Sequence, residues 1–425
     1  MATSNTPAGP DGLLAGYRIL DLCGGHEAIG GKLLADLGAE VIKVEPPGRG
    51  DPARRSPPLA GGMPEPEKSL SWMAFNAGKR GVTLDLSQEA GRELFLRLVE
   101  RSDAVLESFR PGLLQGWGLG YEDLCRVRPE LVLTSVTPFG ATGPYSGWEG
   151  PDLVLWALSG LLYICGDPDR PPVRISQPQA WLHAGTDAAG ATVMALFHRG
   201  RTGRGQQVVV SALKAMERVA YAARTLWDAR GKVLKRPGSS LKIPPLGTTT
   251  PLIWACADGF VAFYLFGGAM GAVSNPELTR WMDEEGLATE AMRSIEWERF
   301  DIGRTPQDAI DRDVVGPIAA FFRRHTQQEL WDEGVRRRVM VYPVHDAMGV
   351  RADEHLSERG FWVRVEHPCL PEPVALPGGF LRAEVDLCRP RGPAPLLGQH
   401  NREIYGGGLG LSDAELSRLG NAGVI

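Results

Sequence analysis

The sequence has no long hydrophobic run and no excess of basic residues. No stretch approaches the roughly 18 consecutive apolar residues that a membrane-spanning helix needs. The 46 lysines and arginines are outnumbered by 51 aspartates and glutamates, which gives a formal net charge of −5, whereas a nucleic-acid-binding protein is usually basic. The opening residues MATSNTPAGPDG have neither a basic patch nor an apolar core, so they predict a short tail instead of a signal peptide. We expect neither a membrane nor a nucleic acid among the partners.

Paired cysteines and metal-ligand spacings are also missing. The six cysteines are scattered without a C-x-x-C pair, and the eight histidines show no spacing typical of a metal site. This pattern favours reduced thiols in the cytoplasm over disulfides or structural zinc. We predict a cytoplasmic protein without a bound metal ion.

Two common motifs of α/β enzymes are absent as well. The glycines after the first predicted strand stand at 24, 25, 30 and 31, so no G-x-G-x-x-G of a dinucleotide site can be written there. The G-x-S-x-G nucleophile elbow of serine hydrolases does not occur either. Dinucleotide binding and Ser-His-Asp hydrolysis are therefore disfavoured.

The sequence does contain an alternation of short apolar runs and helical segments. The segments between the runs, such as 29–37 and 186–198, predict helices. The runs predict buried strands at 17–22, 41–45, 82–86, 104–106, 131–136 and 206–211. This β-α-β spacing indicates an α/β fold with a parallel, doubly wound sheet that has helices on both faces.

The character of the sequence changes after about residue 216. A helix predicted over 217–229 leads into the hinge-like segment GKVLKRPGSSLKIPPLG, and a strand pair with charged helices follows. A chain of 425 residues suggests about two to three domains. We predict the first part of a large domain at 12–225, a linker at 226–249, a smaller α+β domain at 250–340, and a return to the large domain at 341–425.

Basic residues gather at predicted strand ends and in loops. Strand carboxyl ends are where doubly wound sheets bind ligands, so cations there could meet phosphates or a carboxylate. The residues concerned are Lys43, Arg49, Arg54, Arg55, Lys79, Arg80 and Arg110. Two of these basic residues lie in the cluster NAGKR at 76–80 and one in ESFRPG at 107–112, and this clustering favours the interpretation that some of the basic residues line a pocket.

Eight segments, taken in chain order, resemble the class III CoA-transferase family, which includes formyl-CoA and carnitine CoA-transferases and the related alpha-methylacyl-CoA racemases. The segments are LLADLGAEVIKVE (33–45), FNAGKRGVTLDL (75–86), ESFRPGLLQGWGLGYEDL (107–124), VTPFGATGPY (136–145), GPDLVLWALSGL (150–161), ALFHRGRTGRGQQVVVS (195–211), ERGFWVRVEHP (358–368) and LLGQHNREIYGGGLGLSDAELSRLGNAGVI (396–425). The resemblance runs from about residue 16 to the C-terminus and is weakest at 220–340. One matching segment alone would be modest evidence, but eight segments in the family's order are highly specific for this family.

The resemblance implies a Rossmann-like large domain with a parallel sheet built from both chain ends, a smaller α+β domain between them, and an interlocked homodimer. It implies transfer of CoA between an acyl-CoA thioester and a carboxylic acid, with CoA as a substrate and no covalently bound cofactor. The positions that match the family's CoA-contacting segments are His26, Glu27, Ala28, Asn76, Ala77, Gly78, Lys79, Ser108, Phe109 and Arg110. Family members often carry asparagine where Ser108 stands; serine keeps a donor and an acceptor but reaches less far.

The family's nucleophile is an aspartate that attacks the CoA thioester and becomes an aspartyl-CoA thioester. It stands four residues before a glycine at the head of the small-residue helix. Counting back from Gly185 and from TGRGQ places Trp181 at that position, and an indole is no nucleophile. The racemase branch needs a histidine in the GxD segment and the later aspartate. Those positions hold Pro151 and Trp181 here, so racemisation is disfavoured.

Three nearby groups are candidates to replace the missing aspartate. Asp152 fits the GxD pattern, where the family's aspartate is usually structural. Asp187 lies roughly 9 Å along the helix axis from Trp181, and His183 could pair with Asp187 at i, i+4. The catalytic residue therefore stays unknown.

Three interpretations remain open. The chain is an active CoA-transferase that uses an unrecognised group or a partner's aspartate, or a CoA-thioester enzyme of altered chemistry. Alternatively it is a noncatalytic subunit that binds CoA or stabilises an aspartate-containing paralogue in a heteromer.

Overall fold

The computed structural model describes residues 12–62, 65, 67–382 and 387–425. Of the predicted N-terminal tail, only Gly12 lies within these residues. The chain divides into two compact units. The large unit comprises Met1–Leu161, Ile175–Thr225 and Glu354–Ile425, and the small unit comprises Leu162–Arg174 and Leu226–Asp353.

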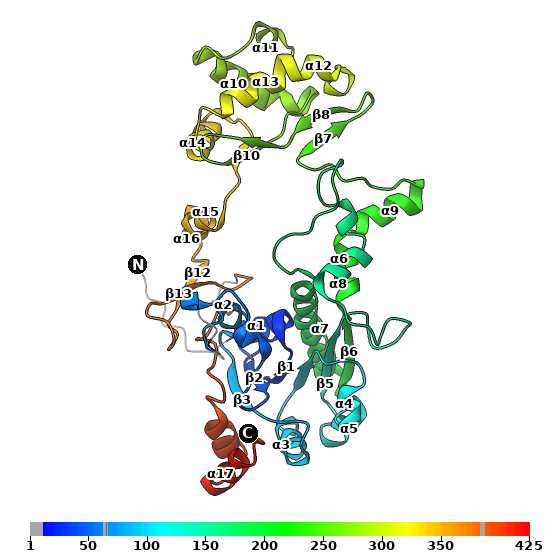
Figure 1. Ribbon diagram of the computed structural model, residues 1–425, viewed down its shortest axis with the longest axis vertical. Coiled ribbons are helices and arrows are strands. Elements are labelled where there is room, and N and C mark those ends of the chain that lie inside the picture. The colour runs from blue at the N-terminus through cyan, green and yellow to red at the C-terminus, as the bar shows by residue number, and fades with distance from the viewer. Residues whose placement is uncertain (1–11, 63–64, 66, 383–386) are drawn as a thin grey trace. The chain divides into compact units, whose positions relative to one another are not determined.

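A six-stranded sheet forms the centre of the large unit, with every pairing parallel and the strand order β3-β2-β1-β4-β5-β6 (Figure 1). The strands are β1 (Arg18–Leu22), β2 (Glu40–Glu45), β3 (Arg80–Thr83), β4 (Ala104–Glu107), β5 (Val132–Thr137) and β6 (Gln206–Ser211). The strand order reverses between β1 and β4, and at such a switch point the strand carboxyl ends open a crevice. The predicted α/β fold with a parallel, doubly wound sheet is confirmed.

Helices cover both faces of this sheet. On one face α1 (Ile29–Asp36) and α7 (Ala180–Thr202) pack against each other, and α7 also packs on β5. Small buried residues along α7, such as Ala184 and Ala188, allow this close approach. The other helices and strands of the unit are α2 (Leu70–Asn76), α3 (Glu89–Val99), α4 (Leu113–Gly116), α5 (Tyr121–Val127), α6 (Asp152–Leu158), α8 (Ala212–Val219), α16 (Glu354–Glu358), β12 (Trp362–Val365), β13 (Val374–Pro377) and α17 (Asp413–Asn421).

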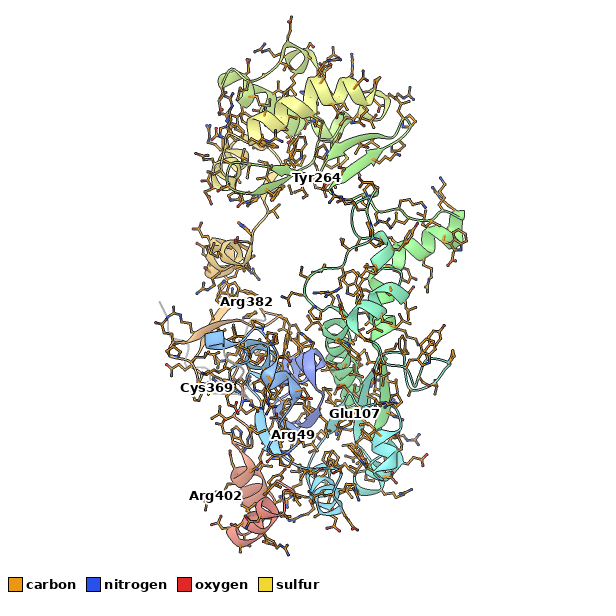
Figure 2. The ribbon with its side chains drawn as sticks, viewed as in Figure 1. Arg49, Glu107, Tyr264, Cys369, Arg382 and Arg402 are labelled. Carbon is orange, nitrogen blue, oxygen red and sulfur yellow. The ribbon has the colours of Figure 1, made fainter. Side chains whose placement is uncertain are left out.

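The opposite face carries a large hydrophobic core to which the C-terminal segment contributes. Ile404 and Tyr405 of the helical turn η7 (Arg402–Gly408) and Val424 join leucines of β1, α3 and α5 in this core. The Tyr405 hydroxyl donates to the carbonyl oxygen of Thr83 at the end of β3, at 2.9 Å. Arg402, labelled in Figure 2, marks the start of η7. Both chain ends therefore build the large unit, but all six strands of the described sheet lie within residues 18–211, which corrects the expectation that the sheet itself uses both ends.

The small unit has its own core and a three-stranded antiparallel sheet of order β11-β10-β9 beside a β7–β8 hairpin. Trp254, Phe263 and Phe322 pack edge to face in the core. The elements are β7 (Ser240–Ile243), β8 (Thr248–Pro251), β9 (Ile253–Ala255), β10 (Phe260–Phe263), α10 (Gly268–Glu284), α11 (Glu290–Ser294), α12 (Gln307–Ile310), α13 (Gly316–Phe322), α14 (Gln327–Arg337), β11 (Val341–Pro343) and α15 (Ala347–Ala352).

Three elements differ most from the predicted limits. β3 spans 80–83 where 82–86 was predicted, and the helix predicted over 217–229 is interrupted at Ala220, between α8 and α9 (Tyr221–Arg230). α7 begins at Ala180, earlier than the predicted residue 186, because Asp152 caps it from outside the helix. One carboxylate oxygen of Asp152 accepts from the backbone N–H groups of Gln179 and Ala180, at 2.8 and 2.9 Å. Trp181 and His183 are therefore helical.

Within the described part of the chain, no helix is both long enough and apolar enough to cross a bilayer.

Candidate functional site

Two loops flank the switch point of the sheet. The chain leaves β1 through the short helix η1 (Gly25–Ala28) and leaves β4 through residues 108–112. Leu22 at the end of β1 pairs with Glu107 at the end of β4, so both loops begin at the same edge. The backbone N–H of Gly24 donates to the Ser108 hydroxyl oxygen at 3.1 Å, which ties one loop to the other.

A cavity of about 370 Å³ opens at this edge, next to the end of β2. We call it the β2 cavity; its lining is Leu22, Gly24, Glu27, Lys43, Val44, Glu45, Pro46, Asp51, Pro52, Leu84, Asp85, Leu86, Ser87, Ser108, Phe109 and Trp117. Its volume lies within the range of roughly 300–1,000 Å³ that is usual for small-molecule sites.

A second cavity of about 390 Å³ lies at the start of α7. We call it the α7 cavity; its lining is Glu27, Ser108, Phe109, Arg110, Pro111, Pro138, Gly147, Trp148, Glu149, Gly150, Pro151 and Trp181. Glu27, Ser108 and Phe109 line both cavities, so the two adjoin at these residues. Together they offer an elongated site along the strand carboxyl ends.

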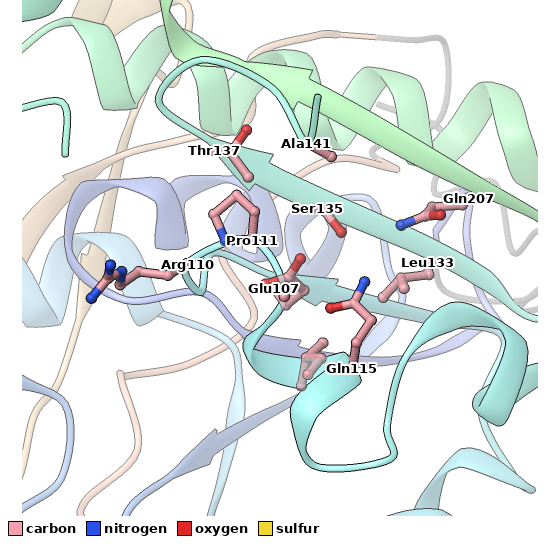
Figure 3. Close-up of a pocket in the computed structure, with 11 residues that line it drawn as sticks. Glu107, Arg110, Pro111, Gln115, Leu133, Ser135, Thr137, Ala141 and Gln207 are labelled. Carbon is pink, nitrogen blue, oxygen red and sulfur yellow. The ribbon is translucent and has the colours of Figure 1, made fainter. Parts of the chain in front are cut away.

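A third cavity, of about 80 Å³, lies between β4, β5 and α4 (Figure 3). Glu107 and Ser135 contribute to its polar lining, and the Arg110 side chain extends away from them. Burial raises the pKa of Glu107, opposed by hydrogen bonds from Ser135 and from the backbone N–H of Phe109 at 2.7 Å. This volume is far below that of a small-molecule site, and Glu107 serves to fix the loop at Phe109.

Glu27 is the most perturbed acid of the two adjoining cavities. Burial is the main reason that its pKa rises to about 7; a hydrogen bond from its own backbone N–H opposes this rise, and the nearby Asp51 carboxylate adds to it. Lys43 acts in the opposite direction but is engaged elsewhere, since it bonds the carbonyl oxygen of Cys23 and lies 3.2 Å from an Asp51 oxygen. Glu27 therefore changes its charge near neutral pH.

Buried ion pairs hold the wall of the β2 cavity. Arg54 is fully buried and binds both carboxylate oxygens of Glu45, each at 2.7 Å, and a Glu67 oxygen at 2.6 Å. Its guanidinium also lies over the Trp72 ring, 3.9 Å from the centroid. Such bidentate pairing satisfies the planar donor set of arginine. Arg54 is thus a structural cation and does not face the cavity.

Asn76 and Lys79, predicted as CoA contacts, are buried beneath the site. The Lys79 ammonium donates to Asp21 at 2.7 Å, to the Ala28 carbonyl at 2.7 Å and to Asn76 at 2.8 Å, which uses all three of its donors. Burial lowers the pKa of Lys79, and Asp21 opposes that effect. Asn76 in turn donates to the carbonyl oxygen of Trp72 at 3.2 Å. These side chains brace η1 from below, and their role as CoA contacts stays a prediction.

Ala77 and Gly78 form the turn between Asn76 and Lys79. Ala77 is fully buried against Val365 and Leu376 of the β12–β13 hairpin. Gly78 has a φ of +77° and donates from its backbone to Pro393 at 3.2 Å. Neither residue lines a described cavity, so this turn anchors the C-terminal segment.

The remaining predicted contacts lie closer to the cavities. Ser108 and Phe109 line both, and Phe109 packs edge to face on Trp117, with ring centroids 5.7 Å apart. Arg110 is exposed and lines the α7 cavity. His26 packs against Phe75, and burial lowers its pKa against the opposing charge of Asp152. Ala28 is buried, with its carbonyl bound by Lys79.

The structure separates Trp181 from its candidate substitutes. Trp181 lines the α7 cavity from the first turn of α7. Asp152 is committed to capping that helix, and Asp187 binds Arg218 at 2.6 Å instead of pairing with His183. None of Asp152, Asp187 and His183 lines a described cavity.

Sequence reasoning assigned no role to two aromatic residues of the cavities. Trp117 lines the β2 cavity, and Trp148 lines the α7 cavity while stacking on Tyr145 with ring centroids 4.3 Å apart. Trp117 lies within a segment that resembles the family and Trp148 lies beside one, and this position was the feature of the sequence that could have identified them. Among the described residues, no group of three or more His, Cys, Asp or Glu side chains is placed to hold a metal ion.

Comparison with known proteins relates this geometry to a family. The sequence model of CoA-transferase family III matches residues 14–401. The subunit BbsE of succinyl-CoA:(R)-benzylsuccinate CoA-transferase from Thauera aromatica is 37% identical over 397 residues, which cover 91% of this chain and 92% of that protein. The alpha subunit of succinyl-CoA–L-malate CoA-transferase from Chloroflexus aurantiacus is 29% identical, covering 97% and 92%, and the beta subunit is 28% identical, covering 97% and 98%.

The fold also matches a solved structure over nearly its whole length. A CAIB/BAIF family protein from Brucella suis superposes with a TM-score of 0.80 at 26% identity, covering 93% of this chain and 99% of that one. The likeness includes both units of the chain.

Proposed function

The chain belongs to CoA-transferase family III, and we propose that it acts as one subunit of a heteromer whose other subunit supplies the nucleophilic aspartate. The reaction moves CoA from an acyl-CoA thioester to a carboxylic acid. Succinyl-CoA is the proposed donor, since the relatives BbsE and the two malate transferase subunits carry it in their names.

The chemistry proposed for the heteromer needs one carboxylate. The aspartate attacks the thioester carbonyl, which expels CoA as a thiolate and forms a mixed anhydride between the aspartate and the donor acid. The thiolate then attacks the aspartyl carbonyl, which releases the donor acid and forms aspartyl-CoA. The acceptor carboxylate attacks aspartyl-CoA, expels the thiolate and forms a second anhydride. The thiolate then attacks the acceptor carbonyl of this anhydride, which gives the new thioester and the free aspartate.

Trp181 is the observation that carries the proposal. By its position relative to Gly185 it stands where the family places the nucleophile, and its side chain lines the α7 cavity. An indole can pack and donate one hydrogen bond but cannot attack a carbonyl. The candidate substitutes Asp152 and Asp187 are bound to other groups. A chain with this site needs a partner to turn over.

The subunit relatives support the same arrangement. BbsE is named as a subunit, and both the alpha and the beta subunit of the malate transferase resemble this chain. Two paralogues of one fold in one enzyme allow one copy to lose its nucleophile while the other keeps it. The exposed apolar residues Met194 and Phe197, each 67% exposed on α7, offer surface for such a contact.

We also propose that the chain retains a cleft for CoA. The β2 cavity would take the adenine end beside Trp117, and the α7 cavity would take pantetheine and the thioester beside Trp181. Arg110 is the exposed cation at the cavity lining for a phosphate, and Ser108 and Phe109 lie between the two ends. Asn76 and Lys79 hold η1 in place underneath.

The assembly and the domain limits belong to the same proposal. We propose interlocked subunits with the large domain at 12–225 and 341–425, a linker at 226–249 and the small domain at 250–340, working in the cytoplasm. Such subunits would bury far more surface than a standard interface of roughly 1,600 Å².

The test compares the chain alone, an aspartate-containing paralogue alone and the two coexpressed. CoA transfer from succinyl-CoA to a panel of carboxylic acids is followed, and acyl-enzyme is trapped with hydroxylamine and located by mass spectrometry. We expect transfer by the coexpressed pair, with the adduct on the paralogue's aspartate and none on this chain. Turnover by this chain alone, with an adduct on one of its own carboxylates, would contradict the proposal.

A further inference from the structure

Glu27 lies where the β2 cavity and the α7 cavity meet, together with Ser108 and Phe109. A pantetheine chain that runs from one cavity to the other passes beside this side chain. Of the three junction residues, only Glu27 can change its charge at ordinary pH. Its protonation state therefore decides what the ligand meets at the junction.

The backbone of Glu27 is clamped against α7. A Cβ atom added at Gly185 would lie 2.8 Å from the Glu27 carbonyl oxygen and 2.7 Å from Ile29 Cγ2, so the two segments are already in close contact. From below, Lys79 binds the carbonyl oxygen of Ala28. η1 is thus held on two sides, and its carboxyl cannot leave the junction by a backbone shift.

The charges around Glu27 come from several elements and are mainly negative. The acids are Asp21, Glu45, Asp51, Asp85, Glu107 and Glu149, the cations are Lys43, Lys79 and Arg110, and Cys23 and His26 are neutral neighbours. Lys43 is bound to Asp51 and to the Cys23 carbonyl, and Arg110 is exposed. An ionised Glu27 is therefore poorly compensated, which agrees with its pKa of about 7.

We propose that Glu27 donates a hydrogen bond to a carbonyl oxygen of the pantetheine chain or of its thioester, so that ligand binding takes up a proton. The inference rests on the CoA cleft of the proposed function. Pantetheine amides and the thioester both present carbonyl oxygens, which only accept hydrogen bonds. A carboxylate also only accepts, whereas a protonated carboxyl donates its O–H. The ionised form would in addition repel the phosphates of CoA. The cleft therefore takes its ligand with Glu27 neutral.

The experiment measures the affinity of the full chain for CoA and for succinyl-CoA by isothermal titration calorimetry between pH 6 and pH 8. For the wild type, the dissociation constant should rise about tenfold over this range, because the carboxyl must be protonated first. At pH 8, titrations in two buffers of different ionisation enthalpy should show uptake of about one proton per ligand.

The variant Glu27→Gln keeps a neutral donor and removes the titration. At pH 8 it should bind about tenfold more tightly than the wild type, with the Glu27-dependent part of the pH dependence gone. The ligand's phosphates titrate in the same way with both proteins, so the difference isolates Glu27. Glu93→Gln, a charge-matched change on the exposed side of α3, should behave as the wild type.

An effect of Glu27→Gln with both ligands points to a pantetheine carbonyl, and an effect with succinyl-CoA alone points to the thioester.

Three outcomes would overturn the inference. The first is an unchanged pH dependence in Glu27→Gln, or its loss in Glu149→Gln instead. The second is no binding of either ligand at pH 6. The third is a covalent acyl or CoA adduct on Glu27, which would make it a nucleophile. The first outcome leaves the CoA cleft and the heteromer's transfer intact, so that failure is separable from a failure of the proposed function; the second outcome would also remove the proposed cleft.

Discussion

The β2 cavity and the α7 cavity share Glu27, Ser108 and Phe109 but have walls of different kinds. Behind the β2 cavity, Arg54 and Lys43 are buried in ion pairs with Glu45 and Asp51. The α7 cavity is walled by the first turn of a helix and by an exposed aromatic loop, in which Trp148 is 56% exposed. One wall is fixed by internal charge, the other by the position of α7.

This difference shows what the basic residues of the strand ends do. Buried cations cost several kcal/mol to desolvate unless they are paired, and here each is paired within the protein. Charge at the strand ends is thus used to hold loops in place. The side chains that reach the junction of the cavities are one acid, one hydroxyl and one aromatic ring.

The largest expected effect tests the charged wall of the β2 cavity. Arg54→Met should destabilise the protein by about 3–5 kcal/mol, because it leaves the Glu45 carboxylate buried and unpaired. Urea denaturation measures the loss. Arg126→Met removes an exposed ion pair with Asp123 and should cost less than about 1 kcal/mol. Equal, small losses in both variants would show that the wall does not depend on internal charge.

The second prediction concerns the junction and has a defined sign with pH. Burial raises the pKa of Glu27 from an ordinary 4.5 to about 7, so the folded state binds a proton that the unfolded state has lost between these values. Stability should therefore fall as pH rises from about 4.5 to about 7 and then level off. Glu27→Gln should lack this fall and exceed the wild type at pH 8 by on the order of 1–3 kcal/mol.

Denaturant unfolding at several pH values from 5 to 8 checks this prediction. Glu93→Gln serves again as the exposed control and should follow the wild-type curve. Parallel curves for wild type and Glu27→Gln would mean that the junction is open to water.

The third prediction tests the other wall, at the contact between α7 and η1. Gly185→Ala should destabilise by about 1–3 kcal/mol, because the added Cβ would lie 2.7 Å from Ile29 and 2.8 Å from the Glu27 carbonyl. Gly190→Ala, in the same helix with nothing within 4 Å of its Cβ, should instead stabilise by about 0.5–1 kcal/mol. Thermal melting of both variants decides whether close packing sets the position of η1.

The smallest expected effect separates capping from catalysis at Asp152. Asp152→Asn keeps an acceptor for the first N–H groups of α7 but loses the charge, which should cost about 0.3–1 kcal/mol. Transfer by the coexpressed heteromer should stay at the wild-type rate. Loss of acyl-enzyme with unchanged stability would instead identify Asp152 as a nucleophile.

Much of the fold followed from local pattern. The apolar runs near 17–22, 104–106 and 131–136 became buried strands, because both faces of a parallel sheet are covered and its strands read as continuous apolar segments. The start of α7 was missed, because its cap is Asp152, a residue far away in sequence. Capping signals are read from neighbouring residues, so a cap of this kind leaves no local trace.

The sites of the basic residues could not be predicted in the same way. Lys79 meets Asp21 across 58 residues of sequence, and Arg54 meets the Pro395 carbonyl across 341. Composition and spacing indicate that basic residues lie near strand ends. Whether each of these side chains is buried depends on which distant segments pack over it. The burial of Asn76 and Lys79 therefore became visible only in the structure.

The sequence alone determined the strand and helix periodicity, the parallel sheet, the family resemblance and the presence of tryptophan at position 181, because each of these depends on residue type and short-range order. Only the tertiary structure decided which charges are internal, how α7 begins, and that Glu27 stands between two cavities. Those properties arise from contacts between distant segments, and desolvation, which sets the charge of Glu27, exists only after the segments have packed.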